Sequence, residues 1–502
     1  MGNFGLLLQG FATSCSPANI VMALFGGIMG ILVGAMPGIG SLLGCALLLP
    51  LTYKMSATTA IIMLAAIYYG NMYGGAFSAI LLNIPGDSPA IMTAMDGYPL
   101  TRKGRSGSAL FTANMASFFG GTVGILILTF MGTSLAAIGL KFGPSEMVAV
   151  MILSLSSISW LLGDSPSKGM IATMLGIILA TIGIDTTSGM VRYTWGSIYL
   201  ISGIQLVPLV IGAFGFAQIM TLFIEKEKDT SSLTGKKVRF RDAIITKKEA
   251  KDCVPVIAKS GIAGTIIGIL PGSGATISAF LCYILNKRTS KRGAEYGSGI
   301  PEGVAASEAA NNAAAAGAFA PLLALGIPGS GTAAVLLSGL MMWGLTPGPQ
   351  LFTEQSDFCW GLISSMYVGN ILCLAVAMLA IPMLVKLVSL PAKLISPVVF
   401  VLCFVGAFAA SNQMVNVYIM LIGACLGYLM NKFEFPTSPM LLSFVLTPTI
   451  EKNLYRSLVV NNGSWSLYWT KPITVVLLLV TITLMVAPQI MKIVKKVKKA
   501  EA

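Results

Sequence analysis

The stretch "GTIIGILPGSGATISAF", residues 264–280, is typical of an apolar helix that is interrupted at its middle by proline and glycine. The stretch "GILVGAMPGIGSLLGCA", residues 30–46, has the same pattern earlier in the chain. Because proline lacks a backbone donor and glycine weakens a helix, each stretch predicts two half-helices joined by a P-G-x-G tip. Within a bilayer such a break is tolerated only where it faces protein or a water-filled cavity. We therefore expect both tips to line a functional site.

The composition is that of a membrane protein. Of 502 residues, 55% are hydrophobic and 10% are charged, and the mean hydropathy is +0.83. A soluble domain carries about 25% charged residues. Apolar stretches of about 20 residues, long enough to cross a bilayer, recur from residue 18 to residue 491. The sequence predicts an all-α polytopic membrane protein with roughly 10–14 membrane segments.

Several function classes are excluded by what the sequence lacks. The sequence contains no histidine, which excludes histidine-dependent catalysis and the H-E-x-x-H zinc site. The eight cysteines form no C-x-x-C pair, so we expect them to be packing residues. No G-x-x-x-x-G-K-[ST] motif suggests ATP hydrolysis. The net charge of +13 is concentrated in loops, as membrane orientation requires, so we expect no nucleic-acid partner. We predict no enzymatic activity and no cofactor.

The basic segment 225–254 is predicted to be a cytoplasmic linker between two halves. Residues 1–224 form the first repeat, with a hairpin (18–53), a broken helix (55–99) and four further helices. Residues 255–449 form the second repeat, with a hairpin (255–286), a broken helix (300–345) and further helices. Residues 450–502 hold a loop, a final membrane helix and a basic tail that we place in the cytoplasm.

The two halves share two ordered motifs. The P-G-x-G stretches match at five positions, and downstream "GGAFSAILLNIPGDSPA" (74–90) matches "AGAFAPLLALGIPGSGTAA" (316–334) with a one-residue insertion. A second Pro-Gly break thus follows the first in each half. Residues 53–56 contain one basic side chain, whereas residues 287–292 contain four. Since basic residues mark the cytoplasmic side, we predict that the two repeats are inverted.

Inverted repeats with paired broken helices are typical of secondary transporters. The N-terminus of a half-helix presents free N–H groups and a positive dipole end, which favour an anion. We therefore predict an anion site between the two tips. The residues that we predict to bind substrate are Gly38, Gly40, Ser41, Asn83, Ser88, Gly272, Ser273, Gly274, Thr276, Gly329, Ser330, Gly331 and Thr332.

Oxygen-bearing residues near the breaks predict a site for a coupling ion, Na⁺ or H⁺. Glu308, Asn311 and Asn312 can share one face of a small-residue helix, and Asn71 lies near the matching place in the first half. Asp87 joins this set because an intramembrane carboxylate suggests function. The alternatives are hydrogen bonds between helices for the first three and a helix cap for Asp87.

Structural and functional alternatives remain open. Gly30, Gly34, Gly264 and Gly268 fit small-x-x-x-small packing contacts between helices better than a binding site. A channel would differ from a transporter by lacking saturable ion-coupled uptake. An intramembrane enzyme is disfavoured, because the two "GDSP" motifs have no histidine as a base.

The chain resembles the large membrane subunit of tripartite tricarboxylate transporters, the TctA type. The resemblance rests on "GAMPGIG", "GILPGSG", "YGGAFSAILLNIPGD", "EGVAASEAANNAAAAGAF" and "FPTSPMLLSFVLTPTIEKNLYRSL" (435–458). In the last stretch Ser443 and Thr447 stand where that family usually has glycine, so we expect looser helix packing there.

This resemblance implies import of citrate or a related di- or tricarboxylate, coupled to a Na⁺ or H⁺ gradient, across a bacterial inner membrane. It also implies two partners. One is a small membrane subunit of the TctB type, and the other is a periplasmic substrate-binding protein of the TctC type.

Overall fold

The computed structural model describes residues 3–36, 40–161, 166–185, 187–217, 219–220, 245–270, 274–388, 392–483 and 485. The chain divides into two compact units. Unit 1 contains residues up to 137, 205–270 and 274–429, and unit 2 contains 138–204 and the described residues from 430. Unit 1 therefore combines helices from both halves of the sequence.

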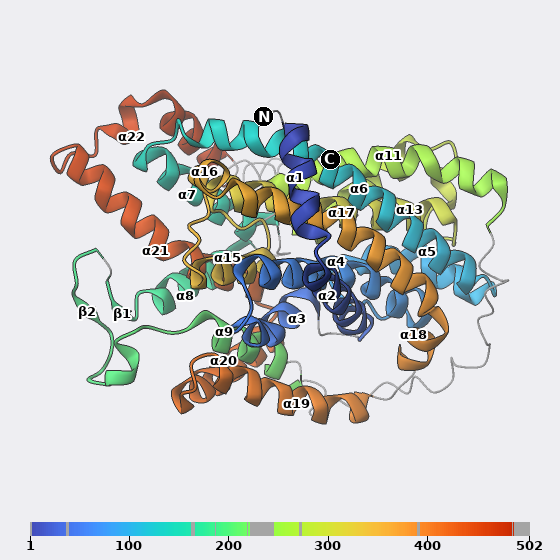
Figure 1. The fold of residues 1–502 in the computed structure, drawn as a ribbon, viewed down its shortest axis with the longest axis horizontal. Helices are drawn as coiled ribbons and strands as arrows, with labels where there is room; N and C mark the ends of the chain where they lie inside the picture. Colours follow the sequence, from blue (N-terminus) through green and yellow to red (C-terminus); the bar gives the residue numbers. More distant parts are fainter. Residues whose placement is uncertain are drawn as a thin grey trace, which may run out of the picture. The chain divides into compact units, whose positions relative to one another are not determined.

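Unit 1 is built almost entirely of helices (Figure 1). Its α-helices are α1 (Asn3–Ser14), α2 (Pro17–Ala35), α3 (Gly40–Leu48), α4 (Ala57–Leu82), α5 (Ala90–Arg102), α6 (Ser106–Gly139), α9 (Leu206–Val210), α11 (Lys247–Ile269), α12 (Gly274–Thr289), α13 (Pro301–Gly317), α14 (Phe319–Leu325), α15 (Gly331–Met342), α16 (Pro349–Glu354), α17 (Ser356–Leu379), α18 (Ile381–Val388), α19 (Ala392–Ala409) and α20 (Met414–Lys432). Short 3-10 helices lie at η1 (Leu49–Thr52) and η6 (Gly293–Glu295), and a π-helix lies at η3 (Ile211–Phe216). The last residues of α6 and α20 belong to unit 2.

Unit 2 contains α7 (Pro144–Leu161), α8 (Pro166–Ala180), η2 (Ile198–Leu200), α21 (Thr437–Val460), α22 (Leu467–Thr470) and a helix over Pro472–Thr483. Strands β1 (Gly183–Ile184) and β2 (Val191–Arg192) pair antiparallel, with Gly183 opposite Arg192. Among the described residues of this unit, ion pairs join Arg192 to Glu451, Glu146 to Lys471 and Lys168 to Glu434.

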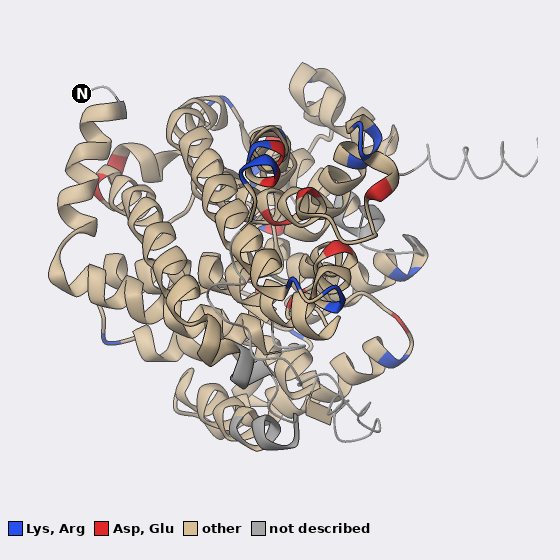
Figure 2. Ribbon diagram, turned by 90° about the vertical axis from the view of Figure 1, so that its right-hand side faces the viewer, with Lys and Arg blue, Asp and Glu red and all other residues tan. Residues whose placement is uncertain are grey.

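Six described helices are long and apolar enough to cross a membrane: Pro17–Ala35, Ala57–Leu82, Ser106–Gly139, Lys247–Ile269, Ser356–Leu379 and Met414–Lys432. Figure 2 shows Lys, Arg, Asp and Glu gathered mostly at helix ends and loops, while long stretches of helix carry no charge. These features confirm the prediction of a helical, multi-pass membrane protein.

Helix α4 is the centre of unit 1, with α2 and α3 beside it (Figure 1). It is apolar all round, and its most hydrophobic stretch is completely buried, as expected of a helix enclosed by other helices. Gly30 and Gly34 on α2 allow the backbones to touch, since a Cβ at either residue would lie 2.3 or 2.4 Å from the carbonyl oxygen of Ile67 or Asn71. These glycines therefore allow close helix packing, as we predicted from the sequence.

Replacing Gly30 with leucine is expected to prevent this packing. The new side chain would collide with the α4 backbone, which cannot move aside, so the free energy of unfolding should fall by about 3 kcal/mol or more. Thermal unfolding in detergent measures the effect. Val21→Leu is the control, because Val21 on the same helix is 56% exposed. Equal stability of the two variants would contradict close α2–α4 packing.

The same contacts recur between α11 and α13. A Cβ at Gly264 or Gly268 would meet the backbone of Ala310 or Ala314. Gly74 on α4 approaches the carbonyl oxygen of Ile31, and Gly317 on α13 approaches that of Thr265. Gly74 and Gly317 thus occupy equivalent places. Residues of α4 and their counterparts in α13 are therefore separated by the same number of positions along the sequence. The one-residue insertion that we predicted from sequence comparison is not needed to align the two halves.

The expectation of looser packing around Ser443 and Thr447 is wrong. Helix α8 lies close against α21, because Gly176 leaves room at the crossing, where a Cβ would lie 2.0 Å from the carbonyl oxygen of Met440. Both hydroxyls donate to carbonyls of their own helix, from Ser443 to Met440 and from Thr447 to Ser443. The small residue is therefore supplied by α8 rather than by α21.

Candidate functional site

A carboxylate lies at the break between α4 and α5. Asp87 Oδ2 accepts hydrogen bonds from Ser41 N at 3.1 Å, Ser41 Oγ at 2.9 Å and Asn71 Nδ2 at 2.7 Å. Its Oδ1 accepts from Ser88 N at 2.7 Å. The first hairpin, α4 and the second break thus meet at one side chain.

The other half of the chain reaches the same place. Thr332 Oγ1 lies 2.8 Å from Ser41 Oγ. Ser41 has a single hydroxyl proton, and if it donates that proton to Asp87 it accepts one from Thr332. Nearby, Tyr68 OH lies 3.1 Å from Ser330 Oγ, which also accepts from Ala333 N and caps α15. We call Ser41, Asn71, Asp87 and Thr332 the Asp87 cluster.

Local sequence explains why the helices break here. Helix α4 ends at Asn83 with φ of 59°, and α14 ends at Gly326 with φ of 70°, both in the left-handed conformation common after a helix C-terminus. Pro85 and Pro328 follow. Gly86 then passes so close to α2 that a Cβ would lie 1.9 Å from the carbonyl oxygen of Gly34. Glycine, which has no Cβ, allows the break to lie this close to the first hairpin.

A second buried carboxylate lies on α13. Glu308 is 0% exposed. Its side chain accepts hydrogen bonds from the hydroxyls of Thr93 on α5 and Ser117 on α6, the latter at 3.0 Å. Asn312 Nδ2 donates to the backbone carbonyl of Glu308 at 3.1 Å, and Asn311 Oδ1 is buried without a hydrogen-bond partner among the described residues. No Lys or Arg in the described part of the chain forms an ion pair with Glu308.

Sequence reasoning missed a third buried carboxylate, Asp96 on α5. It accepts from Gly297 N, Gly299 N and Ile300 N at 2.8–3.1 Å and from Tyr283 OH at 2.7 Å. These backbone donors belong to the loop before α13, so Asp96 fixes the N-terminus of that helix.

The loop before α13 is held a second time by Arg292. Its guanidinium donates to Glu302 at 2.6 Å and to Glu295 at 2.6 Å. The hydrogen bond from Arg292 holds the pKa of the Glu295 carboxyl below its usual range.

A charge in an apolar stretch is the sequence signal that could have directed attention to Asp96.

The predicted site residues separate into several groups. Ser41, Asn71, Asp87, Ser330 and Thr332 come together, and Glu308, Asn311 and Asn312 lie together on α13, linked to the first group through α5. Asn83 and Ser88 are exposed, and Thr276 lies half-buried on α12. Gly40 and Gly274 begin their helices with φ of 65° and 60°, and Gly329 and Gly331 flank Ser330. Gly38, Gly272 and Ser273 lie outside the described residues.

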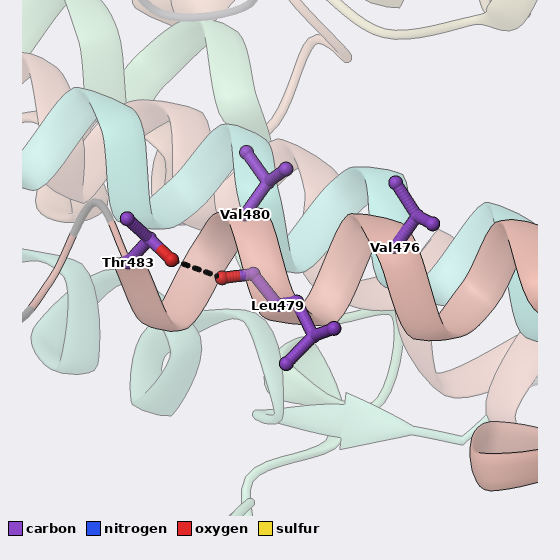
Figure 3. A pocket seen from close by; sticks show the side chains of 4 residues that line it. All are labelled: Val476, Leu479, Val480 and Thr483. Atoms are coloured by element: carbon purple, nitrogen blue, oxygen red, sulfur yellow. Dashed lines mark hydrogen bonds between the residues drawn. The ribbon is translucent and has the colours of Figure 1, made fainter.

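A surface hollow in unit 2 lacks the chemistry of an anion site. It is lined by Val476, Leu479, Val480 and Thr483 (Figure 3). The hydroxyl of Thr483 donates to the carbonyl of Leu479 at 2.8 Å. The lining offers no charged group, so we place the functional site in unit 1.

Comparison with known proteins gives the family. A model of the tripartite tricarboxylate transporter TctA family matches residues 20–442. An uncharacterized 52.8 kDa protein in the TAR-I ttuC' 3' region of Agrobacterium vitis is 37% identical over 474 residues, 94% of each chain. An uncharacterized protein in the TAR-II ttuC' 3' region of the same organism is 36% identical over 230 residues, 45% of this chain and 95% of its own. No solved structure matches. The chain belongs to the tripartite tricarboxylate transporter TctA family.

Proposed function

We propose that this chain is the translocation subunit of a binding-protein-dependent transporter, and that it imports citrate or a related di- or tricarboxylate with a Na⁺ or H⁺ gradient. Membership in the TctA family supports a membrane subunit of a tripartite tricarboxylate transporter. The observation that carries the finer proposal is the Asp87 cluster, in which polar side chains from both halves meet where helices are broken.

Two inverted repeats would explain how one site can open alternately to either side. The recurring contacts support this arrangement. Gly34 packs on α4 as Gly268 packs on α13, and Gly86 approaches Gly34 as Gly329 approaches the carbonyl of Gly268. The site would then lie at the junction of the two repeats, as in other transporters of this architecture.

One ion pair agrees with the proposed orientation in the inner membrane, with a cytoplasmic C-terminus. Arg105 pairs with Glu249 at 2.8 Å, and Glu249 lies in the basic segment 225–254 that we predict to be cytoplasmic. Basic residues concentrate near cytoplasmic ends in such proteins.

Within this proposal the hydroxyls and the carboxylates have different roles. Ser41 and Thr332 provide hydroxyls and a helix N-terminus for a substrate carboxylate, and the Asp87 and Glu308 groups serve the coupling ion. We propose that a small membrane subunit and a periplasmic binding protein complete the system, with the binding protein delivering the substrate. Because the TctA family is a transporter family, we propose no enzymatic activity.

Uptake into vesicles tests this proposal. Vesicles containing the chain, its small subunit and its binding protein are expected to accumulate radiolabelled citrate or a related carboxylate when a Na⁺ or proton gradient is applied. Omitting the binding protein or the gradient should abolish accumulation. Conductance without saturation would indicate a channel instead, and no carboxylate uptake by the assembled complex would refute the substrate class.

A further inference from the structure

The N-terminus of α3 is held by a carboxylate of the same chain. Ser41 is the second residue of this nine-residue helix, so its N–H is one of the donors that a helix leaves unpaired at its start. Both Ser41 N and Ser41 Oγ donate to Asp87 Oδ2, at 3.1 and 2.9 Å. Asp87 therefore takes the place that an external carboxylate would need. We call these two hydrogen bonds the Asp87 latch.

Among the described residues, the carboxylate that forms the latch has no cationic partner. Its hydrogen-bond donors there, from Ser41, Asn71 and Ser88, are neutral. No Lys or Arg among the described residues forms an ion pair with Asp87. Asp87 is half-buried, and a cation would stabilise such a carboxylate in an apolar helix bundle, because neutral donors balance its charge only in part.

An independent observation shows where such a cation would bind. Asn71 is 0% exposed, and its Nδ2 donates to Asp87 at 2.7 Å. With the nitrogen fixed as the donor, the other amide atom is the acceptor Oδ1, which is buried without a hydrogen-bond partner among the described residues. Burying an acceptor without a hydrogen bond is unfavourable. An unused oxygen beside a carboxylate points to a ligand that accepts oxygen lone pairs.

We infer that Asp87 and the Oδ1 atom of Asn71 form a Na⁺ site, and that binding there opens the Asp87 latch and frees the N-terminus of α3 for a substrate carboxylate. Carboxylate, amide and hydroxyl oxygens are hard ligands suited to such a cation. The freed Ser41 N–H and the Ser41 and Thr332 hydroxyls then face the substrate. This inference rests on the proposed function and specifies how the ion is coupled to the substrate.

The latch makes the coupling reciprocal. Asp87 is a weaker acceptor for Ser41 when its charge is shared with a cation, so Na⁺ raises the affinity for the substrate. By linkage, the substrate raises the affinity for Na⁺ by the same factor, which for coupled sites is about 5- to 150-fold. Without Na⁺, the chain's own carboxylate competes with the substrate.

Direct binding of radioactive Na⁺ to the purified chain in lipid nanodiscs tests the cation site without any substrate. Asp87→Asn keeps the size of the side chain but removes its charge, and Asn71→Leu removes the unused oxygen. Each is expected to weaken Na⁺ binding by about tenfold or more, or 1.4 kcal/mol. Asp357→Asn is the control, since Asp357 accepts only from Gln9 among the described residues. Wild-type affinity in Asp87→Asn would overturn the proposal.

Hydrogen–deuterium exchange tests the latch itself. Peptides covering residues 40–48 should exchange faster in NaCl than in choline chloride, because the Ser41 amide loses its acceptor. Asp87→Asn should abolish the difference. Equal exchange of the wild-type protein in the two salts would overturn the latch. Faster exchange in choline chloride on lowering the pH alone would also overturn it, because the site would then bind a proton.

Addition of citrate separates the latch from the proposed function. In NaCl, citrate is expected to slow exchange in residues 40–48 again, as it binds the freed donors. If Na⁺ opens the latch but no carboxylate restores protection, the substrate class is wrong and the Na⁺ site stands. If vesicles accumulate citrate while Na⁺ neither binds nor alters exchange, the latch is wrong and the transport function stands.

Discussion

Replacing Glu308 with glutamine is expected to reduce gradient-driven uptake about 100-fold, which corresponds to about 2.7 kcal/mol, while the protein stays folded in the membrane. Glutamine has nearly the same shape, and the hydroxyls of Thr93 and Ser117 can rotate to donate to its oxygen or accept from its nitrogen. What is lost is a group that can change its charge or bind a cation. The measurement is radiolabelled uptake at equal amounts of membrane protein.

The Glu308 prediction separates an ion-coupling role from a structural one. Asp357→Asn makes the same chemical change at an exposed position and should leave uptake near the wild-type rate. If Glu308 only joins helices through hydrogen bonds, the glutamine variant should also transport normally. Full uptake by Glu308→Gln would therefore exclude Glu308 from ion coupling.

The second large effect is expected on stability, from Asp96→Ala. The change leaves the buried amides of Gly299 and Ile300 without their acceptor, together with the more exposed amide of Gly297 and the hydroxyl of Tyr283. The free energy of unfolding should fall by about 3–5 kcal/mol, because each buried donor left unpaired carries its own desolvation cost. Thermal unfolding of the purified protein in detergent measures this loss.

Two comparisons make the Asp96 prediction specific. Asp96→Asn should lie between wild type and alanine, since its oxygen still accepts from part of the loop while its nitrogen faces other donors. Gly303→Ala should also destabilise, because a Cβ there would lie 1.9 Å from Asp96 Oδ2. An alanine variant as stable as wild type would show that the loop before α13 does not depend on Asp96.

The parts of the structure that could be predicted are those set by local chemistry. The composition and the length of the apolar stretches predict a helical membrane protein. Proline together with glycine predicts the breaks after α4 and α14. The same breaks pointed to Asp87 and Thr332, because polar residues in an apolar segment stand out. Matching motifs in the two halves made it possible to expect that these residues meet.

The contacts that could not be predicted join residues far apart in sequence. The partners of Asp96 are backbone amides of residues 297–300, and backbone amides leave no mark in a sequence. The sequence predicted that the N-terminus of α3 is available to an anion, yet Asp87 already accepts from Ser41 there. Asn83 was predicted to bind substrate, and the structure gives it a local reason to be present, as the left-handed residue that ends α4.

The most direct test of the Asp87 cluster as the coupling site is uptake by Asp87→Asn in vesicles that hold a Na⁺ gradient, with the small subunit and binding protein present. The wild type is expected to accumulate labelled citrate above the external concentration. The variant is expected to bring citrate only to equal concentrations on both sides, because substrate can bind without the cation. Accumulation by Asp87→Asn at the wild-type level would contradict coupling at the Asp87 cluster.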